Sequence, residues 1–388
     1  MNFTVKRAEL YDALKTALHA VTKSSLQAAN GLLISADAHK GTVEITGTDI
    51  RTTVIKRIKE AAVTESGEVV APQVTADIIR LARSEEITLK TDENGVLTLL
   101  FGDSKYELPT IPAKEFPKSK ITYPTNYVSV NGFGTLLRRC AFAAETRGEM
   151  QNIQCVRVKL DSGESRCEAT DTKRMAMSVG LGAADGSMEL LLHISAVNKI
   201  APLADSGTVY VGISPPFAVF VGNNTVFATI MMQQGAPGMQ ALLERFNYDY
   251  CTETTVKALQ SAVDTASGCL LVGDDSCVNI TLTPAAVIIR GEAYRRRSEA
   301  VLPALCSSPS PESGFDYDPR HITDFLRQSS GSLRIAVDRR GFMLLESAGN
   351  KYLVTPRREA EIREPKSPKS EKPKTEKKVT KAKKKKAA

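Results

Sequence analysis

One pattern occurs three times along the chain, at an interval of about 120 residues. A short turn followed by an alternating strand begins at Gly102, again 120 residues later at Gly222, and once more 127 residues later at Gly349. A second pattern, Thr48-Asp49 in the segment TGTDIRTTV, recurs 122 residues later at Thr170-Asp171. A fixed period of this length constrains the fold more strongly than local propensities do. It predicts three similar domains in tandem and argues against a single catalytic pocket.

Local patterns indicate how each repeat is built. Apolar and polar residues alternate in stretches such as 86–90 (EITLK) and 332–337 (SLRIAV), which is typical of half-buried antiparallel strands. Each repeat divides into two halves that each contain a helix, so we expect an α+β fold with two helices packed on antiparallel sheets in every domain. The expected boundaries are 1–120, 121–246 and 247–358 for the three domains and 359–388 for a separate tail.

Helix-start signals mark the second helix of each domain. Thr75, Ser195 and Asp318 stand where these helices should begin, and each side chain can cap a helix. Pro319 follows Asp318 at the first helical position, which tolerates proline, whereas Pro202 should end or kink its helix early. Leu10, Leu14, Leu18 and Val21 recur at helical spacing and predict the first helix, with Arg7, Lys15 and His19 on its other side. The other predicted helices are 76–83, 135–144, 196–203, 254–265 and 320–328.

Positive charge is concentrated at the end of the chain. Residues 359–388 contain 12 Lys and Arg against 5 Glu, a net charge of +7, which equals the +7 of the whole chain. Residues 1–358 therefore carry 39 basic and 39 acidic side chains and are formally neutral. Because the tail has almost no apolar residues, burial cannot offset its chain entropy, and we expect it to be disordered.

No recognisable arrangement of catalytic or metal-binding residues occurs in the sequence. The seven cysteines include no CxxC pair, so we expect free thiols, and the four histidines are scattered. Asp49 and Asp171 look like candidate catalytic carboxylates, but their repetition at equivalent places favours a turn-capping role. We expect no catalytic residue, no metal and no cofactor. Without an apolar run of 18 residues or a signal-peptide pattern, we also expect no membrane partner and a cytoplasmic location.

Several short segments, taken in order, resemble one known family. They are MNFTVKRAEL at the start, VEITGTDI at 43–50, LPTIPAKEFP at 108–117, ATDTKRMA at 169–176 and YLVTP at 352–356. Together with the threefold period they resemble the bacterial DNA polymerase III beta subunit, the sliding clamp, over residues 1 to about 358. The resemblance implies that two chains join head to tail in a closed ring, with helices lining the hole and sheets outside. It implies a non-catalytic protein that encircles double-stranded DNA and tethers the replicative DNA polymerase.

The resemblance also implies a DNA-facing surface on the helices that line the hole. Sliding requires weak contacts with phosphates, because strong pairing or base readout would create barriers to movement. Solvated helix faces ordinarily carry some Lys and Arg, so the residues alone leave both interpretations open. The candidate DNA-binding residues are Arg7, Lys15, Lys23, Arg80, Arg83, Arg138, Arg139, Lys199, Lys257, Arg320 and Arg327.

Members of the family bind short apolar peptides of the polymerase, the clamp loader and other partners between domains 2 and 3. By resemblance, Arg174 and Thr172 would bind peptide carbonyls, while Met, Leu, Val and Pro side chains would form an apolar groove. Core packing is the competing interpretation for Met175 and Leu243. The chain departs from the family at Thr172-Lys173, where Gly-His is common. The candidate pocket residues are Thr170, Thr172, Lys173, Arg174, Met175, Pro237, Leu242, Leu243, Val354, Thr355, Pro356 and Arg357.

The seam between two chains should use edge strands. Tyr106 and Leu108 are candidates on one side, and Leu270 and Leu271, with the strand at 299–305, are candidates on the other. An internal apolar face within one domain would explain the same residues.

Two further interpretations remain open. A diverged clamp paralogue would share the fold, whereas a structural DNA-coating protein would depend on its basic tail and not on its body. A tandem-repeat enzyme would need a polar constellation in one repeat that the others lack, and none is visible.

Overall fold

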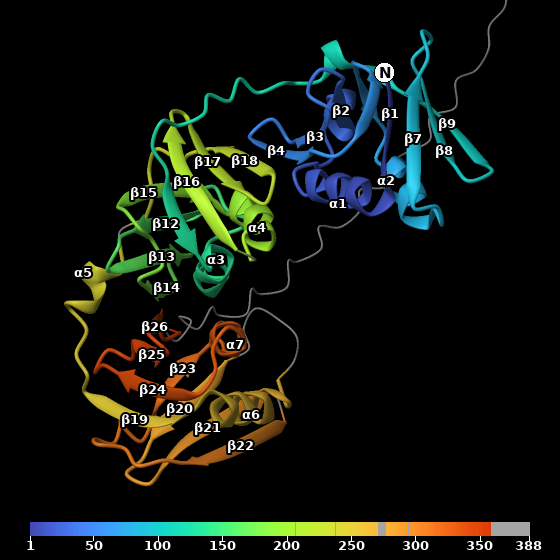
Figure 1. The fold of residues 1–388 in the computed structure, drawn as a ribbon. Coiled ribbons are helices and arrows are strands. Elements are labelled where there is room, and N and C mark those ends of the chain that lie inside the picture. Colours follow the sequence, from blue (N-terminus) through green and yellow to red (C-terminus); the bar gives the residue numbers. More distant parts are fainter. Residues whose placement is uncertain (206, 237, 271–276, 294, 358–388) are drawn as a thin grey trace, which may run out of the picture.

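The computed structural model describes residues 1–205, 207–236, 238–270, 277–293 and 295–357. The described chain forms a crescent in which three domains follow one another (Figure 1). Helices α1, α3, α4, α6 and α7 lie along the concave side, and the sheets form the convex side (Figure 1). The predicted α+β class and the three similar domains are confirmed.

Seven α-helices occur in the described residues, and six of them form three pairs, one pair in each domain. The pairs are α1 with α2, α3 with α4 and α6 with α7. The bounds are α1 Arg7–Leu18, α2 Val74–Leu81, α3 Phe133–Ala141, α4 Ile194–Leu203, α5 Gln240–Leu243, α6 Val256–Ser267 and α7 Pro319–Arg327.

Two large sheets are each shared by neighbouring domains. The nine-stranded sheet joins domains 1 and 2 in the order β10 Ile111–Pro112, β6 Gly67–Ala71, β2 Leu32–Asp37, β3 Thr42–Thr48, β4 Thr52–Ile58, β18 Thr225–Ile230, β17 Phe217–Gly222, β16 Thr208–Ser214, β11 Val128–Asn131. The eight-stranded sheet joins domains 2 and 3 in the order β15 Met188–His193, β12 Cys155–Leu160, β13 Glu164–Thr170, β14 Arg174–Leu181, β26 Asn350–Val354, β25 Met343–Ser347, β24 Ser332–Val337, β19 Tyr250–Thr255. The junctions are therefore continuous antiparallel ladders, β4 with β18 and β14 with β26.

Two smaller sheets lie at the two ends of the crescent. Domain 1 ends in a five-stranded sheet, ordered β5 Ala62–Glu65, β1 Asn2–Lys6, β7 Glu86–Thr91, β8 Val96–Phe101, β9 Ser104–Pro109. Domain 3 ends in a four-stranded sheet, ordered β22 Arg296–Pro303, β21 Ala286–Ala293, β20 Val278–Leu282, β23 Phe315–Tyr317. Among the described residues, the edge strands are β5 and β9 in the first of these sheets and β22 and β23 in the second. Strand β9 ends domain 1 as β18 and β26 end domains 2 and 3, and β22 corresponds to β4 and β14, so β9 and β22 are the counterparts of the strands that meet at the two domain junctions.

The helices pack directly on the sheets. Leu10 and Leu14 of α1 are fully buried in the core of domain 1. Gly47 of β3 and Gly291 of β21 lie against helix backbone, and a Cβ there would come within 2.1 and 2.0 Å of a helix carbonyl oxygen. These glycines are 244 residues apart and occupy equivalent places in domains 1 and 3, so they belong to the repeat.

The predicted helix starts are partly correct. Asp318 caps α7, with its side chain accepting the Arg320 N–H at 2.9 Å, as predicted. Ser195 does not cap α4, because His193 holds the capping position and accepts the Ser195 N–H at 3.2 Å. Thr75 does not cap α2, since the helix begins one residue earlier and the Thr75 hydroxyl is buried without a hydrogen-bond partner. Pro202 lies in the last turn of α4, which ends at Leu203.

Two further sequence-based expectations bear on chemistry. All seven cysteines are free thiols, and three of them are buried. Within the described ranges, no three His, Cys, Asp or Glu side chains are grouped so that they could hold a metal ion.

No described helix combines the length and the apolar character that a membrane crossing requires. The tail predicted at 359–388 lies outside the described residues.

Candidate functional site

The two Thr-Asp turns have the same geometry. Oδ1 of Asp49 accepts the N–H groups two and three residues further on, at 3.1 and 2.7 Å. Oδ1 of Asp171 accepts the corresponding groups at 3.0 Å each. The residue after each aspartate, Ile50 or Thr172, has a left-handed backbone with φ of 77° and 75°. The predicted turn-capping role of both aspartates is confirmed.

Asp49 also links domain 1 to domain 2. Its second oxygen forms an ion pair with the Lys199 ammonium of α4, which donates as well to the Ala20 carbonyl at 3.2 Å. The Lys199 side chain is only 12% exposed as a result. The charge of Lys199 is therefore used at the domain junction, which gives this residue a structural role beside the DNA contact predicted for it.

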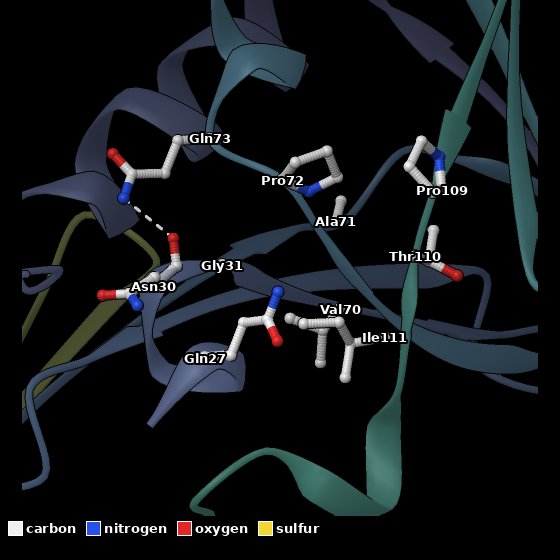
Figure 2. Close-up of a pocket in the computed structure, with 10 residues that line it drawn as sticks. All are labelled: Gln27, Asn30, Gly31, Val70, Ala71, Pro72, Gln73, Pro109, Thr110 and Ile111. Atoms are coloured by element: carbon white, nitrogen blue, oxygen red, sulfur yellow. Dashed lines mark hydrogen bonds between the residues drawn. The ribbon is translucent and has the colours of Figure 1, made fainter. Parts of the chain in front are cut away.

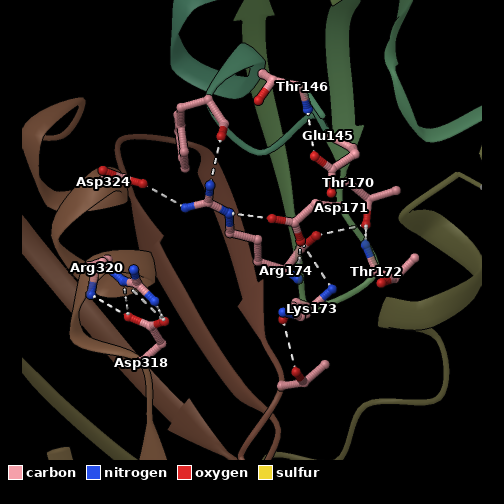
Figure 3. A network of polar contacts seen from close by, with 12 residues as sticks. Glu145, Thr146, Thr170, Asp171, Thr172, Lys173, Arg174, Asp318, Arg320 and Asp324 are labelled. Carbon is pink, nitrogen blue, oxygen red and sulfur yellow. Dashed lines mark hydrogen bonds and ion pairs between the residues drawn. The ribbon is translucent and has the colours of Figure 1, made fainter. Parts of the chain in front are cut away.

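Asp171 takes part in the corresponding link between domains 2 and 3, which Figure 3 shows. The Arg174 guanidinium binds Asp171 at 2.9 Å, Asp324 of α7 at 2.6 Å and the Phe142 carbonyl at 3.0 Å. Burial acts against its charged form, but Tyr352, Asp324 and Asp171 around it raise the Arg174 pKa above its ordinary value. Arg174 thus joins the two domains, which differs from the peptide-binding role expected from the sequence.

The other basic residues of the predicted DNA surface lie on or beside the helices. Arg138 pairs with Asp205 at 2.5 Å and Arg320 pairs with Asp318 at 2.7 Å, so part of the positive charge is balanced locally. Exposed ion pairs of this kind are weak and can exchange partners. Exposed members of the set are Lys15, Lys23, Arg80, Arg83, Arg138, Lys257, Arg320 and Arg327, and half-buried members are Arg7 and Arg139. Their contact with DNA stays a prediction.

A methionine-rich cluster covers the convex face of the junction between domains 2 and 3. We define it by Met175, Met177, Met239, Phe246 and Leu353, all buried together. Leu243 of α5 packs against its edge, while Leu242 is exposed. Met175 and Leu243 therefore lie together, which the pocket prediction and the core-packing interpretation both explain. Phe246 and Met177 were missed by the sequence analysis, because only the pairing of β14 with β26 and the path of α5 bring them in.

The remaining pocket candidates are distributed around this cluster. The Thr170 hydroxyl donates to the Arg174 carbonyl at 2.7 Å, and the Lys173 carbonyl accepts both the N–H and the hydroxyl of Thr355 at 2.9 Å. Val354 is fully buried in the main core and not in the cluster, because neighbouring residues of a strand face opposite sides. Its side chain is therefore not accessible to a peptide in the single chain.

Three other pocket candidates remain at the periphery. Thr172 is exposed at the turn, Pro356 is half-buried, and the Arg357 N–H donates to the Asp316 carbonyl at 2.7 Å. Pro237 lies outside the described residues.

Apart from a groove of about 350 Å³ that is lined mostly by charged residues of domain 1, with Asn223 and Asn224, two cavities are of a size to hold part of a ligand. A polar groove of about 240 Å³ lies beside the start of α5 and is lined by Arg157, Lys159, Arg166, Glu168, Glu189, Gly238 and Gln240. A second cavity, of about 520 Å³, lies in domain 1 (Figure 2) and is lined by Gln27, Asn30, Gly31, Val70, Ala71, Pro72, Gln73, Pro109, Thr110 and Ile111. Gln73 donates to the Asn30 carbonyl at 2.8 Å across this cavity. Neither lining set was expected from the sequence.

Apolar side chains remain exposed at both ends of the crescent. Tyr106 of β9 is 46% exposed and Leu81 of α2 is 69% exposed at the domain 1 end. Val301 of β22 and Leu305 are exposed at the domain 3 end, the latter to 86%. Leu108 is half-buried on β9, Leu270 is half-buried against the core, and Leu271 lies outside the described residues. Leu81 and Val301 were missed, since helix periodicity and strand alternation do not distinguish an open edge from a closed one.

A crescent of repeated domains, with helices on its concave side and sheets on its convex side, is the fold of the bacterial DNA polymerase sliding clamps. Residues 1–121 match the family model described as "DNA polymerase III beta subunit, N-terminal domain". The solved DNA polymerase sliding clamp from Bacillus subtilis has the same fold, with a TM-score of 0.85, 17% identity and coverage of 92% of this chain and 99% of that one. The resemblance to the bacterial beta subunits is confirmed.

Sequence comparison with curated proteins finds the same group. The beta sliding clamp of Bacillus subtilis is 22% identical over 357 residues, which are 86% of this chain and 91% of the relative. The beta sliding clamp of a Staphylococcus epidermidis strain is 27% identical over 188 residues, 46% of this chain and 49% of the relative. In that match the chain spans about half the length of the relative.

Proposed function

We propose that this protein is a DNA sliding clamp, a non-catalytic ring that encircles duplex DNA and tethers the replicative DNA polymerase. The observation that carries the proposal is the pattern of open and closed strand edges. The nine-stranded sheet joins five strands of domain 1 to four strands of domain 2. The open edges belong to a sheet of five strands and a sheet of four, so joining β9 of one copy to β22 of another would make a third shared sheet of nine strands.

Ring closure follows from this geometry. The two open edges are different surfaces, so the contact between copies is heterologous, and such contacts form a closed ring only when the rotation permits it. A chain that already forms a crescent supports closure after two copies. We therefore propose a head-to-tail homodimer with six helix pairs around a central hole.

The concave side suits duplex DNA without sequence preference. Exposed Lys and Arg side chains on the helices give a sequence-independent attraction to phosphates. A closed ring does not depend on strong binding, because it cannot leave DNA sideways. Weak and partly balanced charges are therefore compatible with sliding.

The convex side of the second junction is the proposed docking site for peptides of the polymerase, the clamp loader and other partners. The accessible apolar surface lies at the edge of the methionine-rich cluster, where Leu242 of α5 is exposed and Leu243 is partly buried. The flexible methionines buried beneath it can adapt to different side chains. The adjacent polar groove beside α5 supplies charged groups that can hold an extended peptide. We assign this activity to the cytoplasm, where bacterial chromosomes are copied.

Retention on circular DNA tests the proposal. The protein is loaded onto nicked circular DNA and onto the same DNA after linearisation, with a clamp loader present in both cases. A sliding clamp stays on the circle and is lost from free ends. A DNA-coating protein driven by the tail would stay on both, and a variant lacking 359–388 would then lose DNA association. Equal retention on circular and linear DNA would contradict the sliding-clamp proposal.

The same assay separates a diverged paralogue from the replicative clamp. Both would be retained on circles, but only the replicative clamp would increase the length of DNA made by the replicative polymerase in one binding event.

A further inference from the structure

The final strands of the three domains are equivalent residue by residue. Each follows a two-residue turn from the preceding strand, which fixes the count along it. On this count, residues 105–107 of β9 correspond to 226–228 of β18 and to 351–353 of β26. The pairs that close the three turns are Phe101 with Ser104, Gly222 with Thr225, and Ser347 with Asn350.

The strands that face them are equivalent in the same way. Strands β4 and β14 each follow a two-residue turn, closed by Asp49 with Thr52 and by Asp171 with Arg174, and at the start of β22 Arg296 lies opposite Ala293 of β21. The equivalent glycines of β3 and β21, which contact helix backbone, independently fix the same alignment of domains 1 and 3. Residues 297–299 of β22 therefore correspond to 53–55 of β4 and to 175–177 of β14.

Both closed junctions use one register. At the first junction Phe227 lies opposite Val54, and at the second Tyr352 lies opposite Ala176. These two aromatic residues are buried, to 2% and 0% exposure. Their counterpart on the open edge is Tyr106, which is also aromatic but half-exposed. The open edge therefore has the side chain that a third junction in this register requires.

The charges on the two open edges match in that register. It places Lys105 opposite Glu299 of the partner subunit and Glu107 opposite Arg297 of the partner subunit. At the first closed junction the corresponding pairs are Val226 with Ile55 and Ala228 with Thr53. At the second they are Lys351 with Met177 and Leu353 with Met175. No opposed charges occur at these positions of either closed junction.

We propose that two cross-strand ion pairs, Lys105 with Glu299 of the partner subunit and Glu107 with Arg297 of the partner subunit, form at each seam of the ring. This inference rests on the ring proposed above and adds to it the chemistry of closure. The seam then differs from the domain junctions, because salt weakens it while the apolar junctions within the chain hold. A ring with such a seam opens between subunits and not within one.

In a single chain the four charges are balanced by neighbours. Lys105 pairs with Glu107 at 2.5 Å, and on β22 Glu299 pairs with Arg290 at 2.7 Å and Arg297 with Glu292 at 3.0 Å. All these side chains are substantially exposed, so exchanging partners on closure requires little desolvation. Opposite charges placed directly across two strands attract, and like charges repel by a similar amount.

Charge reversal and charge exchange test the inference. We expect Lys105→Glu to raise the dimer dissociation constant about tenfold, because it places two carboxylates opposite each other at both seams. Lys105→Glu combined with Glu299→Lys should return the constant to within about threefold of the wild type. Glu107→Arg with Arg297→Glu provides an independent second pair. Lys90→Glu is the matched control, since Lys90 is exposed on β7 but that strand is paired on both sides.

The measurement is the dimer dissociation constant from sedimentation equilibrium at low and high salt, with circular dichroism to verify folding. Recovery in the exchanged variants, with no effect of Lys90→Glu, supports the ion pairs. A wild type that dimerises while neither exchanged variant recovers overturns the ion pairs but leaves the clamp proposal intact. A wild type that stays monomeric overturns both.

Discussion

Replacing Tyr106 with alanine should weaken ring formation strongly. A tyrosine buries about 200 Å² when fully covered. The 46% of Tyr106 that is exposed in the single chain therefore corresponds to about 90 Å² that the seam would cover. At about 25 cal/mol per Å², this burial contributes about 2 kcal/mol to each seam. A ring of two chains has two seams, so Tyr106→Ala should cost about 4 kcal/mol, close to a thousandfold in the dimer dissociation constant.

The assay is sedimentation equilibrium across a wide range of protein concentration. Tyr210→Ala is the matched control, because Tyr210 is 49% exposed but lies on β16, which is paired on both sides within the nine-stranded sheet. The control should leave the dimer unchanged, and both variants should keep the circular dichroism spectrum of the wild type. A dissociation constant for Tyr106→Ala within threefold of the wild type would refute the assignment of β9 to the seam.

Three further predictions concern the body of the chain. Gly47→Ala should lower the thermal unfolding midpoint by many degrees, because its Cβ would lie 2.1 Å from a helix carbonyl oxygen. The control Gly102→Ala, whose Cβ would have no atom within 4 Å, should cost only about 1 kcal/mol. Equal effects of the two substitutions would contradict the packing argument. Arg174→Met removes the cation that bridges Asp171 and Asp324 at the junction of domains 2 and 3, and leaves Asp324 only a longer ion pair with Arg327 at 3.7 Å. It should destabilise by about 2–4 kcal/mol in urea unfolding, whereas Arg57→Met, at a more exposed pair, should cost less than about 1 kcal/mol. Burial and the charge of Arg174 lower the pKa of His321. The folded chain therefore binds fewer protons than the unfolded chain, and its stability should fall as pH drops through about 6.5. His321→Gln should reduce that pH dependence in thermal scans from pH 7.5 to 5.5, and an unchanged slope would exclude His321 as its source.

The sequence predicted what its period and its local signals determine. The spacing of the Thr-Asp turns and of the final strands was sufficient for the three domains and for the capping role of Asp49 and Asp171. The cap at Asp318 was readable because a proline follows it directly. The caps predicted at Ser195 and Thr75 were wrong, because several polar residues lie near each helix start and only the backbone geometry decides which of them caps the helix.

Contacts between domains were beyond local reasoning. Lys199 reads as one more basic residue on a helix, and only the approach of domain 1 gives it the Asp49 partner. Val354 reads as part of an apolar motif, yet its place in the strand directs it into the core. Which charges of β9 and β22 would lie opposite each other can be worked out only when the register of the closed junctions is known.

A covalently closed ring on DNA tests the central claim most directly. The seam register places Ser104 opposite Ala300 of the partner subunit. The variant Ser104→Cys with Ala300→Cys should therefore form disulfides at both seams when a mild thiol oxidant is added after loading onto nicked circular DNA. Single-cysteine variants serve as controls for the seven native thiols. We expect a protein–DNA complex that survives denaturing detergent on the circle and is released when the DNA is cut. Loss of the protein from intact circles in detergent, despite complete crosslinking, would contradict it.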